Sequence, residues 1–164
     1  MAEKVAESNG ITVVTGVIGV DAHVTGNWVV NQSLRAAGIN VVALGVCVPQ
    51  EEFVDAAIES HADAIWVTSL YGHARLDCDG LRERCQEGGL TKILLYVGGM
   101  LVVGRQDWEL VSKDFEKLGF NRAYPPNTLP EMALEDLRAD VTEQRQQTKV
   151  KDGSPSAPKE TGSN

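Results

Sequence analysis

An aspartate and a histidine stand two residues apart in the segment Gly19–Gly26, directly after an apolar run. An imidazole that binds a metal usually donates its second ring N–H to a carboxylate, which fixes the tautomer and raises the basicity of the ligand nitrogen. Asp21 and His23 could form such a pair, and Gly26 would let a bulky ligand approach the backbone. On these residues alone a second interpretation stays open, in which Asp21 caps a helix and His23 is a surface side chain.

Two later segments carry further groups of this kind. Ser69 and Leu70 end an apolar stretch, where a serine hydroxyl can bond a ring nitrogen or a ligand oxygen. Gly98 and Gly99 end another stretch, and the absence of side chains there makes room for a ligand. A glycine pair after a strand is most often only a turn, so neither segment identifies a site by itself.

The elements that must position these residues alternate along the chain. Apolar runs, β-branched above all in the first, predict strands at residues 11–18, 40–48, 62–70 and 92–97, and a short fifth strand is expected at residues 121–124. Apolar residues at helical spacing predict helices at residues 24–37 and 50–60. Further helices are expected at residues 76–88, which are rich in polar residues, and at residues 107–118 and 128–144. Thr128 is the expected N-cap of the last helix, with Glu131 completing a capping box.

Five β/α units predict an α/β fold with a doubly wound, five-stranded parallel sheet covered by helices on both faces. The flavodoxin-like strand order 2-1-3-4-5 fits this length and number of units. Ligands bind such sheets outside the carboxyl ends of the strands. The loops at residues 19–26, 68–73 and 98–104 should therefore converge in space.

Composition narrows the classes of function. The chain has 164 residues and a net charge of −8, which disfavours a nucleic-acid binder. It contains no apolar run approaching about 18 residues and no secretory h-region, so we expect a cytoplasmic protein with no membrane span. Three widely spaced cysteines form neither a disulfide framework nor a zinc site. We expect one domain over residues 1–145 and, from its Pro, Ser, Gly and Lys content, a disordered tail over residues 146–164.

In their order and spacing, the D-x-H-x-x-G of residues 21–26, the Ser69-Leu70 strand end and the Gly98-Gly99 pair resemble the family of cobalamin-binding Rossmann-like domains. In that family a histidine replaces the nucleotide base as lower axial ligand of cobalt, and the displaced tail enters a slot beside the sheet. The resemblance implies that His23 is the metal ligand and Asp21 its hydrogen-bond partner. It places Ser69 near the ligand and its tail, with the glycines lining the slot. The cofactor-binding residues that it implies are Val20, Asp21, Ala22, His23, Val24, Gly26, Thr68, Ser69, Leu70, Gly98, Gly99, Met100, Leu101, Val102, Val103 and Gly104.

Longer stretches resemble the small subunits of glutamate mutases. These stretches are Gly16–Gly19, Ser69–Gly72, Asp77–Cys85, Val97–Gly99, Val102–Gln106 and Tyr124–Pro126. Little chain precedes the first expected strand and no barrel is fused to the module, so we expect the catalytic barrel on another chain. Met100 stands where the resemblance leads us to expect an asparagine, and Val20 where a small polar residue is common.

The resemblance implies an isomerase subunit that uses adenosylcobalamin, and hence cobalt, to interconvert L-glutamate and L-threo-3-methylaspartate. Its partner would be the large, or epsilon, subunit, in an assembly of two small and two large subunits. Substrate residues would lie on that partner, so we nominate no catalytic residue in this chain and expect it to be inactive alone. Tyr71, Leu101 and Val102 are candidate interface residues, with a place in the core as the alternative, whereas Trp28, Trp66 and Trp108 are expected in the core.

Three other classes of function are compatible with the fold. A stand-alone cobalamin carrier or sensor would bind the cofactor without mutase activity. An FMN-binding flavodoxin needs several hydroxyls to hold a phosphate at a helix N-terminus, and only Thr25 is available here. A response regulator needs a lysine after the fifth strand, where Ala123, Tyr124 and Pro125 stand instead.

Overall fold

The computed structural model describes residues 10–151. Its centre is one parallel sheet in the order β2-β1-β3-β4-β5, as the sequence predicts. The strands are β1 (Thr12–Val17), β2 (Asn40–Ala43), β3 (Ala64–Ser69), β4 (Leu94–Gly99) and β5 (Arg122–Tyr124). The helices are α1 (Val24–Ala36), α2 (Gln50–Ser60), α3 (Ala74–Cys78), α4 (Leu81–Glu87), α5 (Trp108–Lys117) and α6 (Pro130–Lys151).

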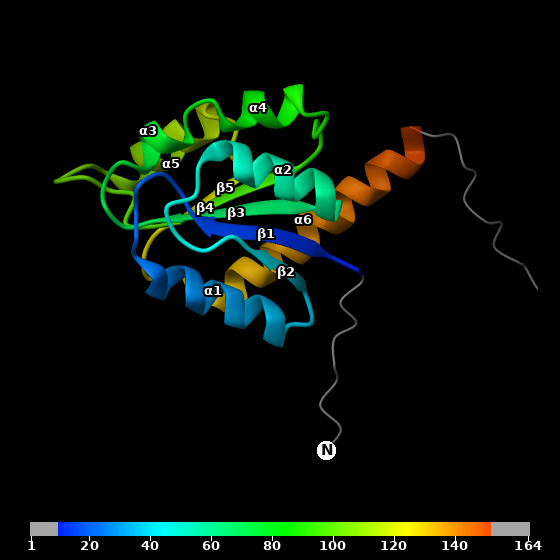
Figure 1. Cartoon of the computed structure of the whole chain (residues 1–164), viewed down its shortest axis with the longest axis horizontal. Helices are drawn as coiled ribbons and strands as arrows, with labels where there is room; N and C mark the ends of the chain where they lie inside the picture. The colour runs from blue at the N-terminus through cyan, green and yellow to red at the C-terminus, as the bar shows by residue number, and fades with distance from the viewer. Residues whose placement is uncertain (1–9, 152–164) are drawn as a thin grey trace, which may run out of the picture.

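Two layers of helices enclose the sheet. Helices α1 and α6 cover one face, and α2, α3, α4 and α5 cover the other (Figure 1). The larger core lies under α2 to α5 around residues such as Phe53 and Phe115, and the smaller one lies under α1 and α6 around Leu34, Tyr96 and Leu137. Strands β1, β3 and β4 are buried on both faces, which explains their continuous apolar sequences.

The expected helix at residues 76–88 is wrong in its extent, because the structure has two short helices there. The chain is extended at Asp79 between α3 and α4. The side-chain amide of Gln50 compensates for this break by donating to the carbonyls of Asp77 and Asp79 at 2.6 and 2.7 Å. The expected second strand is also shorter. It ends at Ala43, and only an isolated bridge between Ile18 and Val48 continues the pairing.

Two further boundaries differ from the sequence-based expectation. Strand β4 runs through the Gly98-Gly99 pair instead of stopping before it, because both residues pair with β3. Helix α6 begins at Pro130, so Thr128 is not its N-cap; the Thr128 hydroxyl donates instead to the carbonyl of Pro125 at 2.9 Å.

Helix α6 also ends later than expected. It continues to Lys151, past the domain boundary expected at residue 145, and it projects beyond the edge of the sheet (Figure 1). The residues between 146 and 151 include glutamine and lysine, which favour helix, and the next glycine in the sequence is Gly153. The rest of the expected disordered tail lies outside the described residues.

Within residues 10–151, no helix is long and apolar enough to cross a membrane. The cysteines are free; Cys78 and Cys85 are buried and Cys47 is exposed.

Candidate functional site

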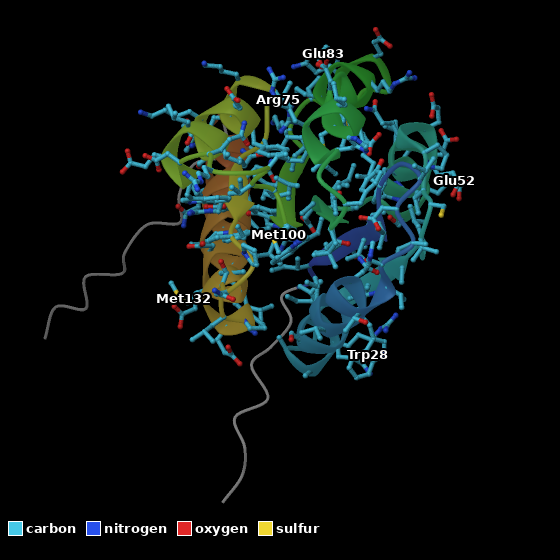
Figure 2. All side chains as sticks on the ribbon, turned by 90° about the vertical axis from the view of Figure 1, so that its left-hand side faces the viewer. Trp28, Glu52, Arg75, Glu83, Met100 and Met132 are labelled. Atoms are coloured by element: carbon cyan, nitrogen blue, oxygen red, sulfur yellow. The ribbon has the colours of Figure 1, made fainter. Side chains whose placement is uncertain are left out.

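The three loops singled out in the sequence meet at the carboxyl edge of the sheet. The Leu70 N–H donates to the Asp21 carboxylate at 2.6 Å, which joins the loop after β3 to the loop after β1. The Met100 N–H donates to the Ser69 carbonyl at 2.9 Å, which brings in the loop after β4. Figure 2 looks onto this edge, with Met100 near its middle. The predicted convergence is therefore confirmed.

Asp21 and His23 form the pair that their spacing suggested. The His23 ring nitrogen Nδ1 lies 2.6 Å from Asp21 Oδ1, and the His23 backbone N–H donates to the same oxygen at 2.9 Å. The Asp21 side chain is fully buried, whereas the His23 side chain is 61% exposed. His23 is the N-cap residue of α1 but makes no side-chain capping bond. The aspartate thus orients an imidazole that faces outward from the sheet edge.

The charge on Asp21 fixes the tautomer of His23. Burial disfavours the charged carboxylate, but hydrogen bonds from Leu70 and His23 outweigh this effect and lower the pKa of Asp21. An ionised carboxylate only accepts hydrogen bonds, so Nδ1 of His23 must be the donor. In the neutral imidazole the other ring nitrogen, Nε2, then carries the lone pair, and this nitrogen makes no hydrogen bond with any described residue.

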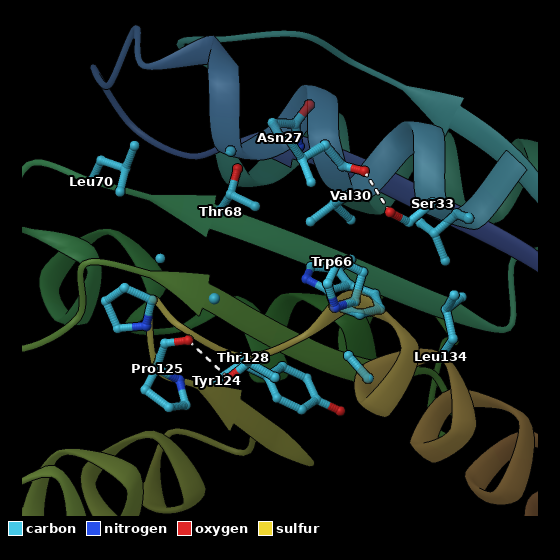
Figure 3. Close-up of a pocket in the computed structure, with 18 of the residues that line it drawn as sticks. Asn27, Val30, Ser33, Trp66, Thr68, Leu70, Tyr124, Pro125, Thr128 and Leu134 are labelled. Carbon is cyan, nitrogen blue, oxygen red and sulfur yellow. Dashed lines mark hydrogen bonds between the residues drawn. The ribbon is translucent and has the colours of Figure 1, made fainter. Parts of the chain in front are cut away.

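A slot opens beside this pair, between α1 and α6 and over strands β3 and β4 (Figure 3). Its volume is about 280 Å³. The lining residues are His23, Gly26, Asn27, Val29, Val30, Ser33, Leu34, Trp66, Thr68, Leu70, Gly98, Gly99, Tyr124, Pro125, Pro126, Thr128, Pro130, Ala133 and Leu134. Most of these side chains are apolar, so the slot suits a ligand whose buried part is largely apolar.

The floor of the slot follows from the strand register. Thr68 of β3 pairs with Gly98 of β4, and Gly98 pairs with Tyr124 of β5. Side chains alternate between the two faces of a strand, so Trp66 lies on the same face as Thr68. The rings of Trp66 and Tyr124 stack, with their centroids 5.6 Å apart and an angle of 20° between their planes. Gly98 therefore leaves a gap in the floor between larger side chains.

The two adjacent glycines differ in what they do. A Cβ on Gly98 would meet only ordinary contacts, the nearest being Tyr124 Cβ at 3.7 Å, so the fold does not require a glycine there. A Cβ on Gly99 would lie 2.1 Å from the Ser69 carbonyl oxygen, and the φ of Gly99 is +120°. Gly99 is thus required by the backbone, whereas Gly98 leaves free space in the slot.

Asn27 Nδ2, in the wall of the slot, is a buried polar atom with no hydrogen-bond partner among the described residues, and so is Ser69 Oγ at the end of β3. The Thr15 hydroxyl donates to Asn31 at 2.5 Å, and the Asn31 amide donates to Asn27 Oδ1 at 3.0 Å. This chain of hydrogen bonds uses the oxygen of Asn27 and leaves its N–H group for another acceptor. Unsatisfied buried polar groups are rare in proteins and point to a missing ligand or water.

The structure separates the remaining predicted site residues into three groups. Thr68 lines the slot, whereas Ser69 does not and, by strand alternation, lies on the opposite face of β3. Leu101 belongs to the core under α2 to α5, and Val102 packs against that core. The residues exposed on the loops are Val20, Ala22, Val24, Met100, Val103 and Gly104.

Trp28 and Tyr71 are the next two aromatic residues for which the sequence made a prediction. Trp28 is 57% exposed, so its expected place in the core is wrong; it lies on the outer side of α1, away from the sheet (Figure 2). Tyr71, a candidate interface residue, is half-buried and donates its hydroxyl to Asp77. Burial and this contact with Asp77 raise the pKa of Tyr71 to about 12.

Comparison with known proteins shows the family to which the chain belongs. Residues 11–119 match the B12 binding domain family. The chain is 54% identical over 130 residues to the glutamate mutase sigma subunit of Clostridium tetani, covering 79% of this chain and 95% of the relative. It is 52% identical over 130 residues to the sigma subunit of Clostridium cochlearium, with the same coverage. The chain belongs to the glutamate mutase sigma-subunit family.

Several solved structures share the fold of this sigma-subunit family member. A methanol:cobalamin methyltransferase complex from Methanosarcina barkeri contains a chain with 30% identity and a TM-score of 0.59, matched over 83% of this chain and 50% of that one. A cobalamin-binding protein from Desulfitobacterium hafniense has a TM-score of 0.60 at 17% identity over 85% of this chain and 58% of its own, which shows the shared fold. The receiver domain of NarL from Mycobacterium tuberculosis, at 11% identity and a TM-score of 0.59 over 81% of this chain and 97% of its own, shares that fold as well.

Sequence reasoning missed most walls of the slot. Asn27, Trp66, Tyr124 and the prolines after β5 all line it, and none was a candidate binding residue. One signal was available, because alternation along β3 places Trp66 on the same face as the predicted binding residue Thr68. The contributions of α6 and β5 depend on packing between distant segments, which no local pattern reveals.

Proposed function

We propose that this chain is the cobalamin-binding subunit of an adenosylcobalamin-dependent mutase that interconverts L-glutamate and L-threo-3-methylaspartate. The observation that carries the proposal is the Asp21–His23 pair at the mouth of the slot. Its geometry provides one oriented imidazole nitrogen beside a cavity for a long, mainly apolar ligand. The sigma-subunit relatives supply the choice of reaction.

His23 is the proposed lower axial ligand of cobalt through Nε2. Among the described residues no group of three or more His, Cys, Asp or Glu side chains could hold a metal ion, so a bare-ion site of that kind is absent there. A single protein ligand fits a metal whose other positions are filled by an organic ring. Asp21 acts as a positioning residue, because its carboxylate holds Nδ1–H and raises the basicity of the ligand nitrogen.

The slot fits the nucleotide tail of such a cofactor. It begins at His23, it is largely apolar, and Gly98 leaves a gap in its floor. Its polar atoms without partners, above all Asn27 Nδ2, match a ligand that carries hydrogen-bond acceptors. When bound, adenosylcobalamin supplies the radical chemistry of the mutase reaction. The chain's own residues bind the cofactor, orient it and keep water from its buried part.

The remaining parts of the enzyme are proposed for a larger partner chain. We assign the substrate-binding residues to an epsilon subunit, in an assembly of two small and two large subunits. Exposed apolar residues on the loops at the carboxyl edge support a covered surface there. Val20 is 80% exposed, Val24 56%, Met100 47% and Val103 52%. Cofactor and partner would together remove this apolar surface from water.

Reconstitution tests the proposal. This chain, adenosylcobalamin and a glutamate mutase large subunit should together interconvert glutamate and 3-methylaspartate, and omission of any one part should abolish turnover. His23→Gly should remove activity and the spectrum of nitrogen-ligated, base-off cobalamin. His61→Gly is the matched control, since His61 is the C-cap of α2 in a left-handed conformation that glycine adopts easily.

Two results would contradict the proposal. An unchanged cobalt spectrum in His23→Gly would refute the axial ligand. Cofactor binding with no turnover would indicate a stand-alone cobalamin carrier, the alternative that the sequence left open.

A further inference from the structure

The indole of Trp66 holds a hydrogen-bond donor without a partner at the floor of the slot. Trp66 is 5% exposed and lines the slot, and its N–H makes no hydrogen bond with any described residue. A Cβ on Gly98 would lie 3.8 Å from Trp66 Nε1, so this nitrogen borders the gap that Gly98 leaves. Figure 3 shows the indole in the gap between α1 and α6.

The indole is held rigidly in this position. It stacks on the Tyr124 ring, and its centroid lies 5.5 Å from the centroid of the Tyr96 ring. The Tyr124 hydroxyl donates to Asp136 at 3.0 Å, and the Tyr96 hydroxyl donates to Asp140 at 2.6 Å. Both tyrosines are thereby fixed to α6. A donor held in one orientation gains affinity because little freedom is lost when a ligand binds.

Trp66 also lies deep in the slot. Leu70, whose N–H holds the Asp21 carboxylate, marks the mouth. Leu70, directly after β3, follows Trp66 by four steps of extended chain, a distance of about 13 Å. A ligand tail that enters at His23 therefore meets Trp66 with its far end.

Asn27 Nδ2 also has no partner, but Asn27 belongs to the α1 wall of the slot and not to its floor. The other neighbouring donors are already used. The Thr68 hydroxyl donates to the Gly16 carbonyl at 3.3 Å, and the Ser33 hydroxyl donates to the Val29 carbonyl at 3.0 Å. The Thr128 hydroxyl donates to Pro125. Among the side chains of the deep floor, the Trp66 N–H is therefore the donor that has no partner, and it borders the gap left by Gly98.

We propose that Trp66 is a specificity residue that donates its indole N–H to a ring nitrogen of the corrinoid's displaced lower base. This inference rests on the proposed function, because it needs His23 to take the place of that base on cobalt. A base nitrogen that has left cobalt carries a free lone pair, and burying it without a donor is costly. The slot would then favour benzimidazole or purine bases over phenolic bases, which have no ring nitrogen.

The test compares three corrinoids on the purified chain. Cobalamin carries a benzimidazole base, p-cresolyl cobamide carries a phenolic base, and cobinamide has no nucleotide tail. Trp66→Phe, and replacement of Trp66 by 3-benzothienylalanine, remove the N–H; the second keeps the size of the ring system. Trp28→Phe is the matched control, because Trp28 is exposed on α1 and does not line the slot.

We expect both replacements at Trp66 to weaken cobalamin binding roughly three- to tenfold, the range of one neutral hydrogen bond. Binding of p-cresolyl cobamide and cobinamide should stay unchanged. For each corrinoid, the affinity of the variant is divided by the affinity of the wild type. Both proteins bind the same ligand, so the cost of detaching the base from cobalt cancels in this ratio. The melting temperature of each variant without ligand, together with its cobinamide affinity, shows that the fold is intact.

A second readout follows the N–H itself. In ¹⁵N-labelled protein, the Trp66 indole resonance, assigned with Trp66→Phe, should move downfield with cobalamin and not with p-cresolyl cobamide.

Several results would overturn the inference. An equal loss for all three corrinoids would make Trp66 only a wall of the slot, and no loss for any would remove it from recognition. A loss for cobalamin on Thr68→Val, with none at Trp66, would assign the base nitrogen to the threonine. If the wild-type chain bound no corrinoid, cobinamide included, the proposed function itself would fail.

Discussion

Gly98→Ala separates the requirements of the ligand from those of the fold. The new methyl group would lie at van der Waals distance from Tyr124 and Trp66, and the backbone of Gly98 does not need positive φ. A Gly→Ala change at a compatible position stabilises a protein by about 0.4–1 kcal/mol. For a chain of this size, each kcal/mol raises Tm by about 2–4 °C. The ligand-free variant should therefore melt at or slightly above the wild-type temperature.

The same methyl group would project into the floor of the slot. Forcing an extra methyl into a packed contact costs about 1–3 kcal/mol. Cobalamin should therefore bind roughly 5- to 150-fold more weakly. Spectral titration measures this loss, and cobinamide, which has no tail to place in the slot, should bind as it does to wild type.

Gly99→Ala provides the contrast. Its Cβ would collide with the Ser69 carbonyl oxygen, so this variant should be destabilised without any ligand present.

Wild-type cobalamin affinity in a stable Gly98→Ala protein would refute the slot as the site of the tail. A strongly destabilised Gly98→Ala protein would refute the reasoning about free space.

Two further predictions follow from ionised groups. Asp21→Asn should weaken cobalamin binding about 10- to 100-fold, the usual cost of losing the carboxylate behind a metal-bound histidine. Spectral titration with cobalamin measures this loss, and wild-type affinity would show that Asp21 only orders the loop before α1. Asp140→Asn should lower the free energy of unfolding by about 1–3 kcal/mol at neutral pH, because Asp140 accepts from Arg122 at 2.7 and 2.8 Å and from Tyr96 at 2.6 Å. The Arg122 hydrogen bond, the largest effect, lowers the pKa of Asp140, so this stabilisation is present above the unfolded-state pKa near 4 and is lost as the pH falls through the folded-state value. Urea titration should therefore give different free energies of unfolding for wild type and variant at pH 7, and the two values should converge in acid. A difference that persists in acid would contradict the assignment of this stabilisation to the Asp140–Arg122 pair.

The parts of the fold that sequence reasoning predicted correctly are those with a strong local signal. β1 and β3 are buried strands that contain several β-branched residues. The helix expected at residues 50–60 begins directly after Pro49 and ends before the turn at His61. The pair of Asp21 and His23 was predictable for the same reason, since two residues of loop hold both groups at one strand end. Local spacing was enough in each case.

Errors occurred where distant contacts decide the structure. The break between α3 and α4 is stabilised by Gln50, which is 27 and 29 residues from its acceptors in sequence. The walls of the slot come from α1, β3, β5 and α6, and only tertiary packing brings them together. Trp28 has an apolar side chain at a helical position, yet α1 turns that position away from the sheet.

The slot is bounded by the first and the last helix of the described chain. Helix α1 begins at Val24, whereas the residues of α6 that close the other wall extend to Leu134. During synthesis the chain emerges from its N-terminus, so His23 and Asp21 leave the ribosome long before the second wall exists. The proposed cobalt ligand His23 is thus available early, but both walls of the slot exist only after α6 has been made and has docked. If the slot holds the cofactor tail as proposed, we expect stable loading only after α6 has docked, and a nascent chain stalled before residue 130 should not retain cobalamin.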